Sequence, residues 1–205
     1  MIMKKAIGIF TLVTLFLLSV VTVNAQTLMI GDTAKDFTLK NVDGSEGSLQ
    51  KLVGSKGAII VFTCNHCPFS KAYEDRIIAL DKNFKGVGYP VIAINPNDPT
   101  RSPEDSYEKM QERSSEKGFP FPYLFDEKQE VAKAFGASNT PHVYLLSVQN
   151  KDLIVKYIGA IDDNSDDPGS VKEKYVENAI NQLMADGKIA VQETKAIGCT
   201  IKWKR

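Results

Sequence analysis

Apolar residues follow two patterns in the first half of the chain: uninterrupted runs, and positions repeated every three or four residues. Residues 57–63 (GAIIVFT) and 90–95 (PVIAIN) form uninterrupted runs rich in β-branched side chains, which is typical of strands buried on both faces. Between them, the apolar residues of 69–84 recur at helical spacing and give one apolar stripe. The pattern therefore predicts a strand, a helix and a second strand in this order.

Two helices are expected in the middle of the chain. Ser102–Asp105 (SPED) combines a capping serine, a proline and two acids, which is typical of a helix start. Asp126 and Gln129 have the spacing of a capping box, and Gly136 would end the helix that follows.

The remaining patterns predict one hairpin before these elements in the sequence, one hairpin after them, and a last helix. Residues 142–147 and 153–158 read as two strands joined by a turn. Residues 36–52 add a hairpin and a short helix at the front. Ser170 and Glu173 form another capping box, which would start the last helix. This is the thioredoxin order of elements: an α/β fold with a central mixed sheet flanked by helices, an N-terminal hairpin extension, and a C-terminal helix plus tail.

The first 25 residues have the layout of a secretory signal peptide. Lys4 and Lys5 precede an apolar run that ends in the small residues Val23 and Ala25. We expect cleavage after Ala25, a thioredoxin-like domain over residues 26–205, and a periplasmic or otherwise exported protein without stable membrane association. The alternative is an uncleaved anchor, because the apolar run approaches the length that spans a bilayer.

Charge and cysteine content narrow the classes of function. Cleavage would remove two lysines and leave 23 basic and 25 acidic residues, a formal charge of −2. This balance does not suggest binding to nucleic acid. Three cysteines are too few for a disulfide scaffold, but an oxidising compartment makes redox chemistry available to them.

Cys64 and Cys67 (CNHC) lie where the first strand meets the helix, a position that favours a redox pair. Three residues apart at a helix start, they are within disulfide reach of one another. The helix dipole and His66 would stabilise a Cys64 thiolate, so we expect Cys64 to be an exposed nucleophile of depressed pKa and Cys67 the resolving thiol. The expected partners are protein thiols or disulfides and a redox partner protein, with no cofactor.

Metal-binding alternatives are weaker. Structural zinc needs four ligands, and no second cysteine pair at finger spacing is present. A Cu(I) carrier that uses Cys64, Cys67 and His142 is a non-enzymatic alternative, because thiolates suit that ion. Cys199, in the C-terminal tail, is either a small buried apolar residue or a third redox thiol.

The segments FTCNHCPFSKAYEDR, INPNDP, FPYLFDE, TPHVYLL and GAIDDN resemble, in this order, the peroxiredoxin-like redoxins. These belong to the superfamily of alkyl hydroperoxide reductase and thiol-specific antioxidant proteins, in the subgroup with a thioredoxin-style cysteine pair. The resemblance spans about Ile30 to Lys204 and implies a thioredoxin fold with thiol–disulfide chemistry. It also implies a cis Thr140–Pro141 bond opposite the cysteines, where a partner's backbone would dock.

The chain departs from the related families at two places. The proline and threonine that shape a peroxide site are absent before Cys64, where Gly57 and Val61 stand. Thiol peroxidase activity is therefore the alternative rather than the first expectation. Thioredoxin has a buried carboxylate six residues before its first cysteine, where this chain has Ala58, so proton transfer would use another group or water.

Overall fold

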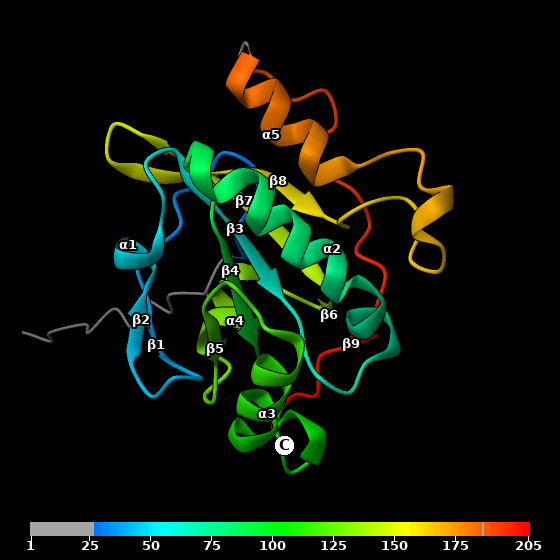
Figure 1. Ribbon diagram of the computed structural model, residues 1–205. Helices are drawn as coiled ribbons and strands as arrows, with labels where there is room; N and C mark the ends of the chain where they lie inside the picture. Colours follow the sequence, from blue (N-terminus) through cyan, green and yellow to red (C-terminus); the bar gives the residue numbers. More distant parts are fainter. Residues whose placement is uncertain (1–26, 186) are drawn as a thin grey trace, which may run out of the picture.

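The computed structural model describes residues 27–185 and 187–205, which form a seven-stranded mixed sheet with the order β2-β1-β5-β4-β3-β7-β8 (Figure 1). Strands β3, β4 and β5 run parallel, and the other neighbours pair antiparallel. The strands are β1 (Thr38–Asn41), β2 (Glu46–Ser48), β3 (Gly57–Phe62), β4 (Val91–Asn95), β5 (Tyr123–Phe125), β7 (His142–Gln149) and β8 (Asp152–Gly159).

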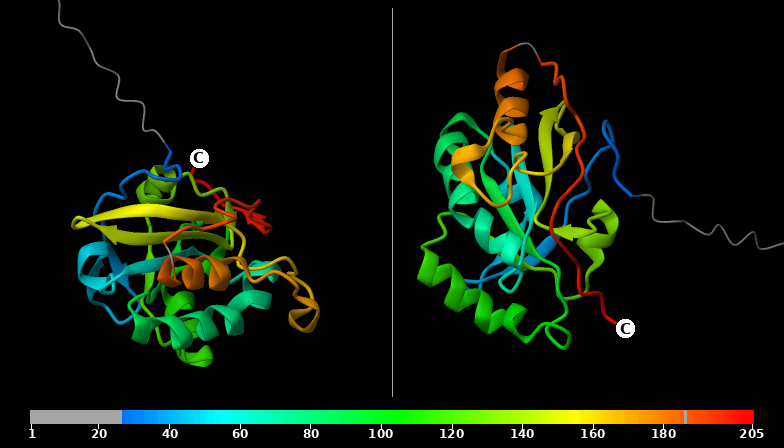
Figure 2. Two further views of the ribbon diagram at one scale, coloured as in Figure 1. Left: turned by 90° about the horizontal axis from the view of Figure 1, so that it is seen from above. Right: turned by 90° about the vertical axis from the view of Figure 1, so that its right-hand side faces the viewer.

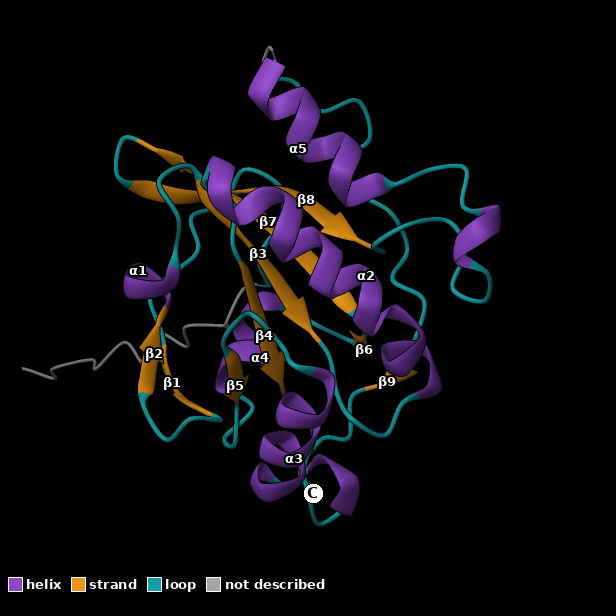
Figure 3. Ribbon diagram, viewed as in Figure 1, coloured by secondary structure: helices purple, strands orange, loops and turns teal. Residues whose placement is uncertain are grey.

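Helices cover both faces of this sheet (Figure 3). One buried apolar cluster joins α2, α3 and α5 to one face, and a second joins α1 and α4 to the other. The helices are α1 (Leu49–Leu52), α2 (Pro68–Phe84), α3 (Tyr107–Lys117), α4 (Glu130–Phe135) and α5 (Tyr175–Ala185), with 3₁₀ turns η1 (Lys85–Val87), η2 (Pro103–Asp105) and η3 (Pro168–Ser170).

The two clusters explain the uninterrupted apolar run of β3. Ile59 and Val61 belong to the cluster under α2, whereas Ile60 and Phe62 belong to the cluster under α4. Because successive strand residues point to opposite faces, a strand covered on both sides needs apolar residues at every position. This buried strand delivers the chain to the cysteine segment.

The expected architecture is confirmed for the sheet, the long helix and both hairpins. Three helix starts are wrong. α4 begins after Gln129 instead of Asp126, although the Asp126 carboxylate accepts the backbone N–H groups of Val131 and Ala132. Ser102 precedes only the 3₁₀ turn η2, and α3 begins after Ser106, whose side chain accepts the backbone N–H of Lys109. The second capping box, at Ser170, falls in η3, and α5 starts later, at Tyr175. The expected signal peptide lies outside the described residues.

The tail after α5 runs in extended form along the molecule (Figure 2). It bonds to the Ile158 backbone of β8 near Glu193 and then forms β9 (Cys199–Thr200), which pairs antiparallel with β6 (Asn139–Thr140). The sequence patterns did not predict this two-stranded sheet. Within the described part of the chain, no helix has the length and apolar character needed to cross a membrane.

Candidate active site

Cys64 and Cys67 lie in the loop between β3 and α2, at the end of the sheet. The helix starts later than the sequence suggested: Pro68 is its first residue and Cys67 is its N-cap, so Cys64 precedes the helix by a full turn. Pro68 has no N–H to leave unpaired at this position. The positive end of the helix dipole therefore acts most directly on Cys67, not on Cys64.

Cys67 is bonded to Cys199, and Cys64 is a free thiol. The Cα atoms of the bonded cysteines are 6.0 Å apart across a separation of 132 residues. The structure thus differs from the expected Cys64–Cys67 pairing. Of the two expectations for Cys199, a small apolar residue or a third redox thiol, this bond contradicts the first.

Thr140 contacts both cysteines of the CNHC segment. Its hydroxyl Oγ1 lies 3.1 Å from Cys64 Sγ, and its carbonyl oxygen lies 3.3 Å from Cys67 Sγ. The peptide bond from Thr140 to Pro141 is cis, as expected. The backbone of Thr140 is paired with Cys199 in the β6–β9 sheet, so the chain's own tail occupies this side of the proposed docking residue.

Cys64 is buried, with 3% of its surface exposed, which contradicts the expectation of an exposed nucleophile. Burial raises the pKa of the Cys64 thiol, and the negative charge of Asp105 raises it further. Hydrogen bonds from Thr140, the Cys67 backbone and Ser70 lower this pKa, but not enough to cancel the increase. The expectation of a depressed Cys64 pKa is therefore wrong for this state of the protein.

Asp105 organises the loop around Cys64. Its carboxylate accepts the backbone N–H groups of Asn65 (2.6 Å) and His66 (3.2 Å) and side-chain donors of Asn97 (2.8 Å) and Ser102 (2.7 Å). Its Oδ2 also lies 2.5 Å from Nδ1 of His66. The side chain of Asp105 is completely buried, and these donors compensate its charge.

His66 lies between this carboxylate and the free thiol. The same Nδ1 that contacts Asp105 is 3.6 Å from Cys64 Sγ, and 24% of the His66 side chain is exposed. The predicted proximity of His66 to Cys64 is thus present, with a carboxylate partner that the sequence did not reveal. The carboxylate and the thiol thus meet at one imidazole nitrogen, and the contacting atoms of the three side chains all lie within 4.8 Å of one another.

The sequence offered one unused signal for Asp105. The acids of Ser102–Asp105 predict a helix start, but the turn η2 instead directs the Asp105 side chain to His66, 39 residues earlier in the chain. Thioredoxin has a buried carboxylate at the position of Ala58, and the sequence did not indicate which residue of this chain could replace it. Asp105 supplies a buried carboxylate near the Cys64 thiol, but from the segment between β4 and α3 and not from β3, which contains Ala58.

A second buried carboxylate approaches Cys64 from α2. Glu74 and Cys64 line the same small cavity, which Tyr123 also borders. Glu74 is paired with Arg113 of α3 through two hydrogen bonds, of 2.8 and 2.7 Å. This ion pair fixes α3 against α2 behind the cysteine loop.

The copper-site alternative does not fit the structure. Cys67 is in a disulfide, and Nδ1 of His142 accepts the backbone N–H of Ser138 at 3.4 Å. Among the described residues, the group of possible metal ligands that does come together is Cys64, His66 and Asp105. The oxygens of Asp105 in that group already accept bonds from protein donors.

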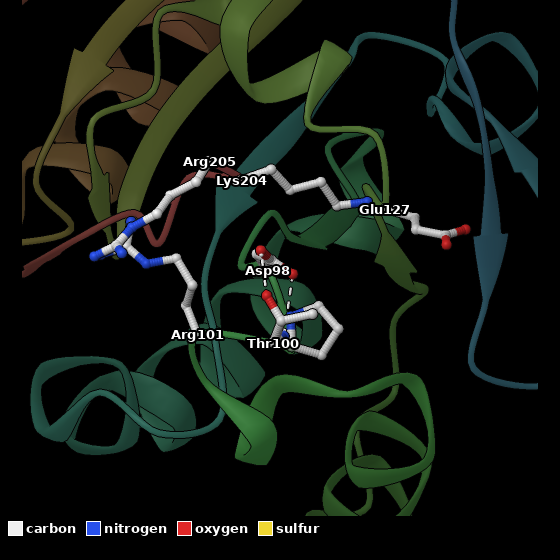
Figure 4. Close-up of a pocket in the computed structure, with 7 residues that line it drawn as sticks. Asp98, Thr100, Arg101, Glu127, Lys204 and Arg205 are labelled. Atoms are coloured by element: carbon white, nitrogen blue, oxygen red, sulfur yellow. Dashed lines mark hydrogen bonds between the residues drawn. The ribbon is translucent and has the colours of Figure 1, made fainter.

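A surface hollow beside the C-terminus is separate from the cysteines (Figure 4). Arg101 and Arg205 extend toward the same side of it, and Lys204 points toward Glu127. Neither His66 nor any of the cysteines lines it, so it plays no part in the thiol site. Its lining residues are Asp98, Pro99, Thr100, Arg101, Glu127, Lys204 and Arg205.

Comparison with known proteins assigns the chain to a family. The AhpC/TSA family model matches residues 30–163, and the chain belongs to this family. A crystal structure of an uncharacterized conserved protein from Geobacillus kaustophilus is 38% identical, covers 86% of this chain and 93% of its own, and superposes with a TM-score of 0.78.

Two further relatives connect the family to thioredoxin-like proteins. The solution structure of a putative thioredoxin from Neisseria meningitidis is 25% identical over 77% of this chain and 95% of its own, with a TM-score of 0.56. The fold is thus thioredoxin-like. The thiol-disulfide oxidoreductase ResA of Geobacillus thermodenitrificans is 27% identical over 125 residues, 60% of this chain. The match spans 66% of ResA, just under two thirds of its length.

Proposed function

We propose that this protein is an exported thiol–disulfide oxidoreductase that exchanges disulfides with protein partners. The observation that carries the proposal is a free thiol and a disulfide that meet at one residue: Cys64 and Cys67 both contact Thr140. Thiol–disulfide exchange requires a thiolate that attacks a disulfide sulfur. Similarity to the thiol-disulfide oxidoreductase ResA supports the same chemistry.

In the proposed reaction Cys64 forms the mixed disulfide with the partner, and Cys67 resolves it. Thr140 and Pro141 would position the partner, and His66 would relay a proton to or from Cys64. The thiol pair exchanges two electrons with the partner, so no cofactor is needed. The position of Cys67 at the N-cap favours its thiolate and therefore its role as attacking or leaving group.

The test is disulfide reduction in an insulin assay with dithiothreitol as the electron source. We expect the purified protein to accelerate insulin reduction, and we expect Cys64→Ser and Cys67→Ser variants to return it to the uncatalysed rate. Cys67→Ser should additionally accumulate mixed disulfides at Cys64, visible on non-reducing gels. A Cys64→Ser variant with the full rate would overturn the proposal.

Export is proposed from the sequence of the first 25 residues. We expect the protein recovered from the producing cell to begin at Gln26 and to be found outside the cytoplasm. Mass spectrometry of its N-terminus tests this directly. An intact Met1 on membrane-associated protein would instead support the uncleaved anchor.

A further inference from the structure

The C-terminal tail brings a third cysteine to the site and fixes it there. Cys199 is bonded to Cys67, and its backbone pairs with Thr140, the residue that contacts both other cysteines. All three thiol positions are therefore gathered around one residue.

The tail is held by many contacts besides the disulfide. The backbone N–H of Ile201 bonds to Ser138, and the N–H of Lys202 bonds to the side chain of Asn97. The side chain of Gln129 bonds to the tail on both sides of Trp203. Ile201 is itself buried, with 3% of its surface exposed. Reduction of the disulfide would therefore leave Cys199 close to Cys67.

The three cysteines differ in their access to solvent. Cys64 and Cys67 are buried, with 3% and 0% of their surfaces exposed, whereas Cys199 is partly exposed. An external thiol can therefore approach the disulfide more readily at the sulfur of Cys199. Attack there releases Cys67, whose thiolate is favoured at the N-terminus of α2.

We propose that Cys199 is a third redox cysteine, which takes over the disulfide from Cys64–Cys67 and presents it to an external dithiol reductant. This inference rests on the proposed function. The observed Cys67–Cys199 disulfide would then be the state that follows reduction of the partner and precedes reduction by the external dithiol. In this state Cys64 is a free thiol, and reduction of the Cys67–Cys199 bond by the external dithiol returns Cys67 for the next partner.

The steps balance in atoms and electrons. A partner disulfide takes up two electrons as Cys64 and Cys67 form their disulfide through a mixed disulfide at Cys64. The Cys199 thiolate then attacks the Cys67 sulfur, the Cys67–Cys199 bond forms, and Cys64 leaves as a thiolate that takes a proton. A thiolate of the external dithiol attacks Cys199 and releases the Cys67 thiolate. The second external thiol then frees Cys199 and becomes part of the external disulfide.

The first experiment follows the disulfide in the unmodified protein. The fully reduced protein is mixed with one equivalent of oxidised insulin, quenched with N-ethylmaleimide at successive times, and mapped by mass spectrometry. We expect Cys64–Cys67 to appear first and to be replaced by Cys67–Cys199. A disulfide that remained at Cys64–Cys67 would overturn the relay.

The second experiment separates the relay from the proposed function. Cys199→Ser should form Cys64–Cys67 in a single turnover at the wild-type rate, but its multiple-turnover rate with thioredoxin as the dithiol should fall at least tenfold. Thr200→Ser, an exposed neighbour in β9, serves as the matched control with unchanged rates. Loss of the single turnover in the wild-type protein would contradict the proposed function itself. An unchanged multiple-turnover rate in Cys199→Ser would contradict only the relay.

A third experiment distinguishes a purely structural disulfide from a redox-active one. If the bond is only structural, Cys199→Ser should lower the urea midpoint, and thioredoxin should leave the wild-type Cys67–Cys199 bond oxidised. That result would overturn the proposal. Reduction of the Cys67–Cys199 bond by thioredoxin within the time of one turnover supports the proposal. This measurement uses the wild-type protein, so its outcome does not depend on whether a variant folds.

Discussion

Nδ1 of His66 and Oδ2 of Asp105 lie 2.5 Å apart, and the carboxylate behind this contact is completely buried. Asp105 therefore acts on the thiol in two ways. It positions the imidazole 3.6 Å from Cys64 Sγ, and its negative charge contributes to the raised pKa of that thiol. The balance between these effects decides how reactive Cys64 is at neutral pH.

Asp105→Asn should lower the pKa of Cys64, because it removes a negative charge that opposes the thiolate. The measurement is the iodoacetamide reaction of Cys64 as a function of pH, on protein with the Cys67–Cys199 bond intact. We expect the midpoint to move to lower pH and the rate at pH 7 to rise several-fold.

The control for this change is Asp43→Asn, which removes an exposed carboxylate in the turn between β1 and β2. It should leave the midpoint where it is in the wild type. Circular dichroism checks that Asp105→Asn keeps the fold, since Asn offers an N–H₂ group where the carboxylate accepted donors. A midpoint that moved to higher pH in a folded variant would show that the charge of Asp105 does not oppose the thiolate.

Hydrogen peroxide should react slowly with Cys64, although the chain belongs to the AhpC/TSA family. The thiolate is the nucleophile, and the raised pKa of this buried thiol keeps most of it protonated at neutral pH. Stopped-flow kinetics on protein with the Cys67–Cys199 bond intact measures the rate, with Cys64→Ser as the blank. A fast reaction that saturates with peroxide would make thiol peroxidase the better assignment.

The sheet and the position of the cysteines could be predicted because they depend on local sequence. The uninterrupted apolar run 57–63 identifies a strand buried on both faces, and the strand ends where CNHC begins. The apolar stripe likewise identifies α2. Neither prediction required knowledge of a distant segment.

The partners of Cys64 and Cys67 could not be predicted because they come from distant parts of the chain. Asp105 reaches His66 across 39 residues, and Cys199 reaches Cys67 across 132 residues. Local patterns do not specify such contacts. The spacing of CNHC favoured the nearer pairing, whereas the β6–β9 sheet positions Cys199 next to Cys67.

His142 should make the protein less stable in mild acid. Its ring is buried with 8% exposed, and burial lowers its pKa from 6.5 to about 4. Above pH 6.5 the ring is neutral in both states. As the pH falls toward 4, the unfolded chain binds a proton that the folded protein excludes, so stability is lost over this interval.

The variant His142→Phe should remove this dependence while it keeps an aromatic ring against Tyr144. Between pH 7 and 4.5 the wild type should lose about 2–3 kcal/mol more than the variant, since each pKa unit corresponds to about 1.4 kcal/mol. Urea denaturation at the two pH values measures it. Equal losses in the two proteins would show that His142 is not the responsible group.

Asp162, in the loop between β8 and η3, should matter for stability. It is buried and accepts bonds from Tyr73 of α2 at 2.8 Å and from Arg76 at 2.7 Å. Asp162→Ala leaves both donors without this partner and should cost about 3–5 kcal/mol. Asp166→Ala, exposed in the same loop, should change the urea midpoint little. Equal effects of the two substitutions would contradict the buried ion pair.

Gly198 allows the tail to approach Thr140 closely, because it has no Cβ. A Cβ at this position would collide with the carbonyl group of Thr140, the same group that lies 3.3 Å from Cys67 Sγ. Gly198→Ala should therefore push β9 away from β6 and separate Cys199 from Cys67.

We expect Gly198→Ala to contain mostly free Cys199 after mild oxidation, and the disulfide to form between Cys64 and Cys67 instead. Thiol alkylation followed by peptide mapping measures both populations. Gly86→Ala is the matched control, because a Cβ at Gly86 meets no atom within 4 Å. It should retain the Cys67–Cys199 bond. A Gly198→Ala protein with that bond fully formed would show that the tail tolerates displacement and that close pairing with Thr140 is not what brings Cys199 to Cys67.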